Sequence, residues 1–326
     1  MSRRALEIAA FLEQSDWAEA DQFPIEADFS PRRYARLDRA DGKRAILMDA
    51  DPDQHTDSFV DIALLLKSMD ISAPEIYAAH DENGLVIMEY LGNRNCGNAL
   101  DAGGDAKALY RRAVDLLIHL HQTFDKEKAR SIDLPIFSAA LFASQVETYL
   151  DYYFPYVKGR EATREEGEEF RAAWRQVLKS VDQWPQTLML RDFMPDNLMD
   201  LKDREGWRSL GVLDFQDGGL GPAAYDLASL CEVVRRDGGD QYLHEMIEYY
   251  YNQMKPTQSL AEFKNICILL SLQRHMRILG VIVRLAQKTG RQEKLAFIPR
   301  IQSYVQDLVD HPALLPLKVW LQQTQS

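Results

Sequence analysis

The stretch from residue 198 to residue 213 constrains the fold of this chain most strongly. Two short apolar segments, 198–201 and 207–213, flank five residues that are either charged or glycine. Apolar segments separated by such a turn are typical of a β-hairpin. The sequence therefore predicts a hairpin embedded in a region whose other segments have the pattern of helices.

The first 91 residues have the pattern of a small antiparallel sheet with helices beside it. A turn signal, Ala40-Asp41-Gly42, joins the first two predicted strands, and Asp81-Glu82-Asn83-Gly84 joins the last two. The predicted strands are 33–37, 44–48, 76–80 and 85–90, and the predicted helices are 1–20 and 59–69. We interpret residues 1–91 as a strand-rich N-lobe.

Residues 92–326 are predicted to form a mostly helical C-lobe. Apolar residues recur at helical spacing between residues 107 and 124, and helices are also expected over 137–153, 165–181 and 266–287. The fold class is therefore α+β with two lobes, and a cleft between two such lobes is a natural ligand site.

The segment before the hairpin carries the residues most suggestive of chemistry. Asp192 is followed five residues later by Asn197, which is the spacing of the kinase catalytic loop. In that chemistry a carboxylate orients the acceptor hydroxyl and takes its proton. An amide oxygen nearby holds a metal ion without adding negative charge beside the phosphates. Asp192 is thus the candidate base and Asn197 a candidate metal ligand.

The second strand of the hairpin ends in Asp214-Phe215, where a kinase places its Mg²⁺-binding aspartate. The hairpin is expected to fold Asp214 back against Asn197, so that both reach one ion. Mg²⁺ prefers oxygen ligands and shares its shell with substrate phosphates. A surface loop followed by an ordinary hairpin is the alternative interpretation.

Each of two other carboxylates near this motif has more than one possible role. Asp217 could be a second metal ligand, an acceptor contact or a turn residue. Asp226 lies in the first turn of a predicted helix, where it could favour the helix dipole or accept backbone N–H groups of the catalytic loop as structural support. Alternation along the chain predicts that Asp196 and Asp200 face solvent.

The chain resembles the aminoglycoside phosphotransferase/choline kinase superfamily, and within it the branch of anomeric N-acetylmuramate/N-acetylglucosamine kinases. The resembling segments span nearly the whole chain, and they are residues 27–37, 47–50, 88–92, 190–192, 214–217, 224–227, 273–274, 278–280 and 298–300. The Asp-Phe-Gln-Asp sequence at 214–217 and the arginine before Asp192 point to this branch.

This resemblance implies a bilobal protein-kinase-like fold, with ATP and Mg²⁺ as cofactors. It implies that Asp192 is the base and that Asn197 and Asp214 bind Mg²⁺. It also implies that residues 1–91 are a nucleotide-binding N-lobe, in which the backbone of Glu89, Tyr90 and Leu91 meets the adenine. The acceptor would be a sugar hydroxyl at the anomeric carbon, in cell-wall recycling.

The means of holding the phosphates departs from the protein-kinase pattern. The chain has no GxGxxG, and Met48 and Asp49 stand where a strand lysine is expected. Ser30, with free backbone N–H groups and Arg32 or Arg33, could cradle phosphates instead. The alternative for this segment is an ordinary surface loop. For the missing lysine, either Arg33 or Arg36 is a candidate replacement, or the phosphates are held mainly by Mg²⁺.

Candidate acceptor contacts lie in the helical region. Arg274 shares one arc of a helix with Arg277 and Arg284, and arginine suits planar oxyanions such as a carboxylate. Ion pairing with neighbouring helices is the alternative. Glu147 and the tyrosines that follow it, Tyr149, Tyr152 and Tyr153, could contact a sugar or pack in the core.

The amino-acid composition excludes some kinds of binding partner. The net charge of −12 argues against nucleic acid, which calls for basic surfaces. The longest apolar run, residues 266–272, is too short to cross a bilayer, so no membrane is expected. Three scattered cysteines indicate a reducing cytoplasm rather than a disulfide framework.

Three functions remain open from the sequence. The first is a kinase that phosphorylates a small molecule, with an amino sugar favoured. The second is a nucleotide-binding pseudokinase regulator, suggested by the missing lysine and glycine-rich loop. The third is a kinase for an aminoglycoside, an amino alcohol or a protein hydroxyl.

Overall fold

The computed structural model describes residues 2–25, 32–51, 54 and 56–324. These residues group into two compact units. The first unit comprises residues 1–134 and 192–218, and the second comprises residues 135–191 and 219–326. The segment with the candidate catalytic residues therefore belongs to the same compact unit as the N-terminal sheet.

The first unit is built on a five-stranded antiparallel sheet in the order β1-β2-β3-β5-β4. Its strands are β1 (Asp21–Ile25), β2 (Arg33–Asp38), β3 (Arg44–Asp49), β4 (Ile76–His80) and β5 (Leu85–Glu89). In this register Arg33 pairs with Asp49, so the start of β2 lies beside the end of β3. That pairing matters for the site described below.

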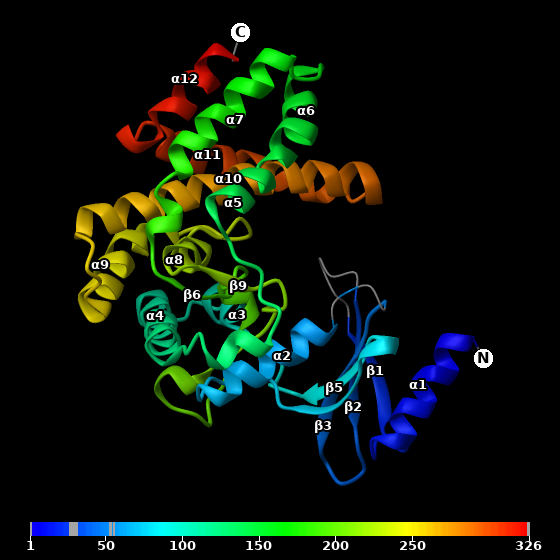
Figure 1. The fold of residues 1–326 in the computed structure, drawn as a ribbon. Helices are drawn as coiled ribbons and strands as arrows, with labels where there is room; N and C mark the ends of the chain where they lie inside the picture. The colour runs from blue at the N-terminus through cyan, green and yellow to red at the C-terminus, as the bar shows by residue number, and fades with distance from the viewer. Residues whose placement is uncertain (1, 26–31, 52–53, 55, 325–326) are drawn as a thin grey trace. The chain divides into compact units, whose positions relative to one another are not determined.

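Helix α1 (Arg3–Gln14) covers one face of this sheet. Its buried Phe11 and Leu12 pack in one cluster with sheet residues, among them Leu37, Leu47 and Ile87. Helix α2 (Thr56–Ser68) lies on the opposite side of the sheet from α1 (Figure 1). The sheet is therefore covered by a helix on each face.

The remainder of the first unit carries the embedded hairpin. Its elements are α3 (Cys96–Asp101), α4 (Ala106–Thr123), β7 (Leu198–Asp200) and β8 (Leu210–Val212). Leu91, at the end of the sheet region, packs with Met199, Leu201 and Leu213 of the hairpin. A Cβ at Gly211 would lie 2.8 Å from the Leu91 side chain, so the hairpin and Leu91 approach each other closely here. The hairpin is thereby fixed against the segment that follows β5.

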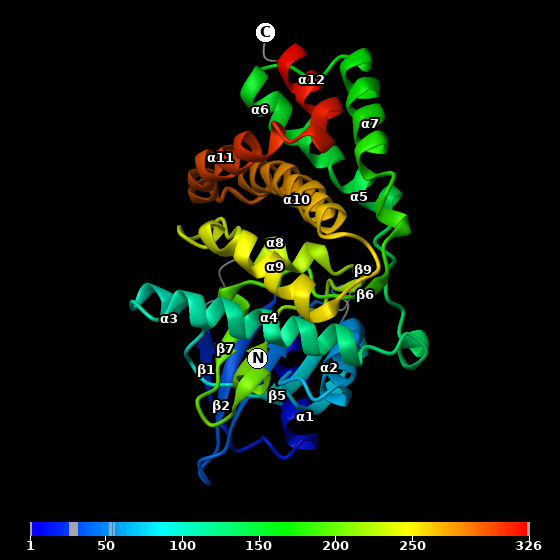
Figure 2. The same cartoon turned by 90° about the vertical axis from the view of Figure 1, so that its left-hand side faces the viewer.

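The second unit is mostly helical, with a two-stranded antiparallel sheet of β6 and β9. Its elements are α5 (Ala139–Gln145), α6 (Phe154–Lys158), α7 (Arg164–Leu178), β6 (Gln186–Met189), β9 (Gly219–Pro222), α8 (Ala224–Cys231), α9 (Leu243–Met254), α10 (Leu260–Thr289), α11 (Ile298–Val309) and α12 (Leu315–Gln323). Helix α12 packs along α7, as both views show (Figures 1 and 2).

Helix α10 is the central helix of the second unit. Among the described residues it alone is long and apolar enough to cross a membrane, but 78% of its most apolar window is buried inside the protein. A Cβ at Gly280 would lie 2.2 Å from the carbonyl oxygen of Thr148, so α10 touches the backbone of the segment between α5 and α6. Burial of this kind is typical of the core helix of a globular unit.

Most predicted elements are confirmed, two predicted elements differ in form, and two observed elements were not predicted. Strand β1 and helix α3 were not predicted from the sequence. The helix predicted over 137–153 is instead α5 followed by a turn of π-helix at Tyr149–Tyr153. The predicted strand 207–213 is shorter, because Gly206–Ser209 forms a 3-10 turn and only Leu210–Val212 extends.

The predicted division at residue 91 remains a prediction about function. Compactness groups α3, α4 and the hairpin with the sheet rather than with the later helices. A nucleotide-binding region at 1–91 and a helical region at 92–326 are therefore not the same division as the two compact units.

Candidate active site

The chain enters the candidate catalytic loop under tight backbone control. Asp226 is fully buried, and its two carboxylate oxygens accept the backbone N–H groups of Leu190 and Arg191 at 2.7 and 2.8 Å. Arg191 has a φ of +70°, and its carbonyl oxygen accepts a bond from the Ser229 hydroxyl at 2.9 Å. Such a left-handed conformation persists only where surrounding contacts hold it. These bonds fix the turn that immediately precedes Asp192.

The three principal candidate residues meet within the first unit. Asn197 Nδ2 donates to the Asp192 carbonyl oxygen at 2.8 Å and lies 3.3 Å from Asp214 Oδ2. The backbone N–H of Leu213 donates to the Asn197 carbonyl oxygen at 2.9 Å, which extends the hairpin ladder up to the site. The hairpin therefore brings Asp214 back to Asn197, as the sequence predicted.

The Asp214 carboxylate is held in a negatively charged environment. The pKa of Asp214 is raised, first by desolvation from the surrounding protein and second by the negative charge of Asp192. Asp214 nevertheless keeps part of its surface exposed to solvent. Asp217 raises it further, whereas a hydrogen bond from Gln216 and the charge of Arg32 lower it. Gathered carboxylates of this kind suit a cation, which would relieve their mutual repulsion.

Aromatic packing fixes the residue after Asp214. Phe215 is fully buried and stacks on Phe59 of α2, with ring centroids 4.9 Å apart. Asp214 itself has a φ of +58°, and the Gln216 amide donates to its Oδ1 at 2.8 Å. The buried ring of Phe215 thus fixes the backbone next to Asp214, and the Gln216 amide orients the Asp214 carboxylate.

The donor set fits Mg²⁺ only together with a phosphate-bearing ligand. Among the described residues, no three His, Cys, Asp or Glu side chains cluster in a way that would hold a metal ion. Because Asn197 uses its amide nitrogen on the Asp192 carbonyl, its amide oxygen is the atom left for an ion. Mg²⁺ is commonly held by one or two carboxylates plus substrate phosphates, and Asp214 with Asn197 fits that pattern.

The residues predicted to hold phosphates separate from one another. Ser30 lies outside the described residues. Arg32 is buried, and its Nη2 donates to the carbonyl oxygen of Gln54 at 2.7 Å. Arg33 instead binds Asp49, with Nε 2.8 Å from Oδ2. Arg36, the other candidate for the missing lysine, pairs with Asp38 of its own strand.

The segment predicted to meet adenine lies at the end of β5. The Glu89 carboxylate accepts bonds from Arg204 at 2.9 Å and from the backbone N–H of Glu75 at 3.2 Å. Tyr90 interacts with Arg36, and Leu91 packs in the apolar cluster of the hairpin. Side-chain contacts thus hold this segment in place beside the hairpin.

Two predicted acceptor residues are engaged in other contacts. Arg274 is 2% exposed, and its Nη1 donates to the Glu232 carbonyl oxygen at 3.1 Å. Glu147 forms an ion pair with Arg171, with Oε2 2.7 Å from Nη2. These contacts favour the structural alternative for both residues. Asp217 is exposed close to Asp214, so its acceptor or metal role stays a prediction.

Three residues that contribute to the site were not predicted from the sequence. Gln216 donates to the Asp214 carboxylate, and Phe59 stacks on the ring of Phe215. Ser229 donates to the carbonyl oxygen of Arg191. Only Gln216 had a sequence signal, because it belongs to the Asp-Phe-Gln-Asp motif. The contacts of Phe59 and Ser229 depend on tertiary packing that spacing along the chain does not reveal.

Two pockets that are open to solvent are lined by other residues. One, of about 340 Å³, is lined by residues of α2 and α4, including Met69 and His119. The other, of about 400 Å³, is lined by Asp151, Glu168 and Arg171 among others. Neither pocket is lined by Asp192, Asn197 or Asp214.

A family model described as "Phosphotransferase enzyme family" matches residues 22–262. Among curated relatives, the N-acetylmuramate/N-acetylglucosamine kinase of Pseudomonas aeruginosa is 29% identical over 306 residues, covering 90% of this chain and 86% of the relative. The N-acetylmuramate/N-acetylglucosamine kinase of Caulobacter vibrioides is 26% identical, covering 98% of this chain and 96% of the relative.

Solved structures resemble the fold at lower identity. The GDP complex of wild-type aminoglycoside 2'-phosphotransferase-IIIa has a TM-score of 0.65 and 15% identity, covering 94% of this chain and 99% of that chain. Choline kinase LicA from Streptococcus pneumoniae has a TM-score of 0.63 and 13% identity, covering 94% of this chain and 100% of that chain. At these identities the likeness shows a kinase-like α+β fold alone.

Proposed function

The chain belongs to the phosphotransferase enzyme family, and from that premise we propose that it is an ATP-dependent amino-sugar kinase. The acceptors to test first are N-acetylmuramate and N-acetylglucosamine, phosphorylated on the anomeric hydroxyl in cell-wall recycling. The proposal is carried by the contacts of the Asn197 amide with the Asp192 carbonyl oxygen and the Asp214 carboxylate, together with the effect of the Asp192 charge on that carboxylate. The names of four curated relatives, 26–29% identical over most of the chain, support the acceptor class.

The proposed chemistry assigns one role to each residue. Asp192 orients the sugar hydroxyl and takes its proton as the hydroxyl attacks the γ-phosphorus of ATP. Asn197, through its amide oxygen, and Asp214 would hold Mg²⁺, which neutralises phosphate charge when it is bound. Asp226 is a positioning residue, because its carboxylate holds the backbone of the loop.

The nucleotide is proposed to bind along the end of β5. Leu91 packs in a buried apolar cluster with the hairpin residues Met199, Leu201 and Leu213, and a purine ring would bind beside this cluster. The backbone of Glu89, Tyr90 and Leu91 would supply hydrogen bonds to the adenine. Residues 1–91 are proposed as the nucleotide-binding region, with Ser30, Arg32 and Arg33 as its candidate phosphate residues.

A cytoplasmic location agrees with this function and with the cysteines. Cys96, Cys231 and Cys267 are all buried free thiols. Burial raises the pKa of the Cys96 thiol to about 12, so it stays protonated and unreactive. ATP is abundant in the same compartment that keeps such thiols reduced.

The test is a panel of acceptors assayed for both ADP and phosphorylated product. The panel contains N-acetylmuramate, N-acetylglucosamine, an aminoglycoside, choline and ethanolamine, each with ATP and Mg²⁺. We expect the two amino sugars to give the highest kcat/KM. A higher kcat/KM for an aminoglycoside or amino alcohol would replace the proposed acceptor. ATP binding without product on any acceptor would favour a pseudokinase regulator.

A further inference from the structure

The start of strand β2 presents two adjacent arginines in different directions. Successive side chains of a strand point to opposite faces of the sheet. Ala35 and Leu37 of β2 pack against the cluster that contains α1, so Arg33 shares that face. Arg32, one residue earlier, binds the carbonyl oxygen of Gln54, and its charge acts on the Asp214 carboxylate. The direction of one arginine is thus linked to the direction of the other.

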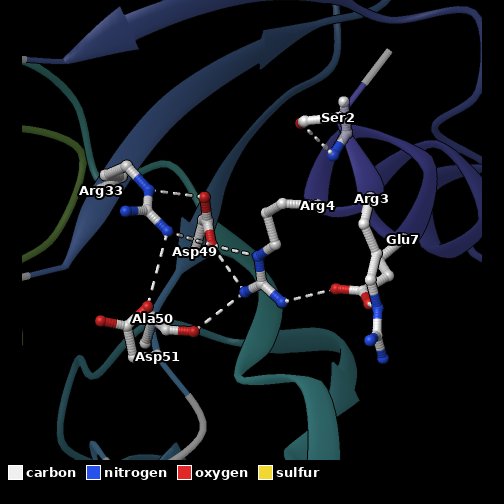
Figure 3. A network of polar contacts seen from close by, with 9 residues as sticks. Ser2, Arg3, Arg4, Glu7, Arg33, Asp49, Ala50 and Asp51 are labelled. Atoms are coloured by element: carbon white, nitrogen blue, oxygen red, sulfur yellow. Dashed lines mark hydrogen bonds and ion pairs between the residues drawn. The ribbon is translucent and has the colours of Figure 1, made fainter.

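Arg33 is held in a cluster that we call the Asp49 clamp, consisting of Arg4, Asp49 and Arg33 (Figure 3). Arg33 Nε lies 2.8 Å from Asp49 Oδ2, and Arg33 Nη2 lies 3.2 Å from Oδ1. From α1, Arg4 Nε and Nη2 lie 2.8 and 2.6 Å from Oδ1 of the same carboxylate. One carboxylate on β3 therefore joins α1 to the start of β2.

Further contacts hold the Arg4 end of the clamp. Arg4 Nη2 donates to the carbonyl oxygen of Ala50 at 2.9 Å, and its Nη1 lies 3.2 Å from a Glu7 oxygen (Figure 3). Side-chain exposure falls from 60% at Arg33 to 26% at Arg4 and 11% at Asp49. Asp49 is therefore the buried centre and the arginines are its more exposed ends.

The charges of the clamp are arranged to stay ionised. Burial by itself would raise the pKa of Asp49, but hydrogen bonds from Arg33 and Arg4 outweigh it and leave the pKa below its ordinary value. Charge-assisted bonds with two donors per guanidinium also fix orientation, which a lysine in either place would not do. The clamp thus sets direction as well as charge.

We propose that the Asp49 clamp positions Arg32, and that Arg32 rather than Arg33 replaces the missing strand lysine toward the nucleotide phosphates. The reason is geometric, since Arg33 is anchored on Asp49 at the α1 face, whereas the adjacent Arg32 contacts Gln54 and its charge acts on the Asp214 carboxylate. In this arrangement the carboxylate lies on the strand and the cations come from α1 and β2. The proposal rests on the proposed function, because the phosphates belong to ATP.

The first test compares two neighbouring arginines of α1. Both Arg3 and Arg4 pair with Glu7, but only Arg4 reaches Asp49. We expect Arg4→Gln to raise KM for ATP about tenfold, the effect of losing one charge-assisted bond pair, with the KM for the acceptor unchanged. Arg3→Gln is the control and should leave both values unchanged. Arg4→Lys should recover part of the loss.

The second test asks whether the clamp acts through Arg32. Arg32→Gln should raise KM for ATP at least as much as Arg4→Gln does. In the double variant Arg4→Gln/Arg32→Gln, the KM should equal that of Arg32→Gln alone, because nothing remains to be positioned. Multiplied effects in the double variant would overturn the proposal. So would an equal rise of both KM values in Arg4→Gln.

Two controls keep this outcome separate from folding and from the proposed function. Far-UV circular dichroism and the Tm of each variant identify loss of structure. The variant Arg33→Gln removes the other arginine of the clamp, and its KM for ATP is measured in the same way. If the wild type binds ATP·Mg but transfers no phosphate, the same four-variant cycle is read from Kd values. The proposed function would then fail while the clamp is still tested. A wild type that binds no nucleotide would overturn both.

Discussion

The amide nitrogen of Asn197 lies 3.3 Å from an Asp214 carboxylate oxygen, although the residues are 17 positions apart. The β7–β8 hairpin produces this proximity, because its strands pair Leu198 with Val212 and leave the two polar residues at one end. A hairpin is a local structure, so the site needs little of the distant chain to bring its ligands together.

The first prediction concerns the metal requirement. Asp214→Asn removes the carboxylate that would hold Mg²⁺, so the Mg²⁺ concentration for half-maximal rate should rise more than tenfold and kcat should fall about 100-fold. Initial rates over a Mg²⁺ series at fixed ATP measure both. Asp203→Asn, at an exposed carboxylate in the hairpin turn, is the control. An unchanged Mg²⁺ dependence in Asp214→Asn would remove Asp214 from the ligand set.

The second prediction concerns the support of the catalytic loop. In Asp226→Asn one of the two N–H donors would face an amide NH₂ group instead of an oxygen. Losing a charge-assisted bond at a buried site should lower the free energy of unfolding by about 2–4 kcal/mol. Ser229→Ala, which removes one neutral bond to Arg191, should lower it by about 1 kcal/mol.

Urea unfolding of both variants checks this order. The Asp226→Asn enzyme should also lose kcat while its KM for ATP stays close to the wild-type value, since the nucleotide segment is elsewhere. Equal stability of Asp226→Asn and wild type would contradict the support role of Asp226.

The third prediction concerns a buried ionisable pair in the second unit. His275 Nε2 lies 3.0 Å from Glu232 Oε2, beside Arg274 and with the Tyr304 ring stacked on the imidazole. Ser271 donates to the same Glu232 oxygen. Burial lowers the pKa of His275 below its ordinary value of 6.5, although Glu232 opposes the shift. The folded protein therefore keeps this histidine neutral where the unfolded chain would protonate it.

The sign of the pH effect follows from that difference. Below about pH 6.5 the unfolded state binds the extra proton, so the free energy of unfolding should fall by up to about 1.4 kcal/mol per pH unit. Well above pH 6.5 the free energy of unfolding should return to its full value. His275→Gln keeps an N–H donor near Glu232 but cannot titrate, so its stability should change less between pH 7 and pH 5. His244→Gln, at an exposed histidine, should follow the wild type. Parallel pH curves for His275→Gln and wild type would contradict this account.

The parts of the fold that sequence reasoning located are those with strong local signals. The hairpin was predicted from two apolar segments around charged residues, and the site was predicted from short motifs on either side of it. Strand β1 was missed because it is exposed along its whole length and contains Pro24, so it lacks the alternation of a half-buried strand. Helix α3 was missed because it is short and includes Gly97.

Long-range packing explains the other differences. The helix predicted over 137–153 breaks where Gly280 of α10 meets the backbone of Thr148, a contact 132 positions away that no local pattern contains. Asp200 was expected to face solvent, but it pairs with Arg112 at 3.1 Å and with Arg94 at 3.7 Å. Asp196 is half-buried rather than exposed. The alternation of side chains along a strand predicted the wrong environment for these two aspartates, because helices α3 and α4 pack against the hairpin.

The role of Asp192 is tested most directly by product formation in matched variants. Wild type, Asp192→Asn and Asp203→Asn are each incubated with ATP, Mg²⁺ and N-acetylmuramate, and ³¹P NMR records the phosphorylated sugar. Wild type and Asp203→Asn should form one anomeric sugar phosphate per ADP, and Asp192→Asn should be slower by about 10²–10⁴-fold with nucleotide binding retained. Equal rates of sugar-phosphate formation in wild type and Asp192→Asn would contradict the assignment of Asp192 as the base.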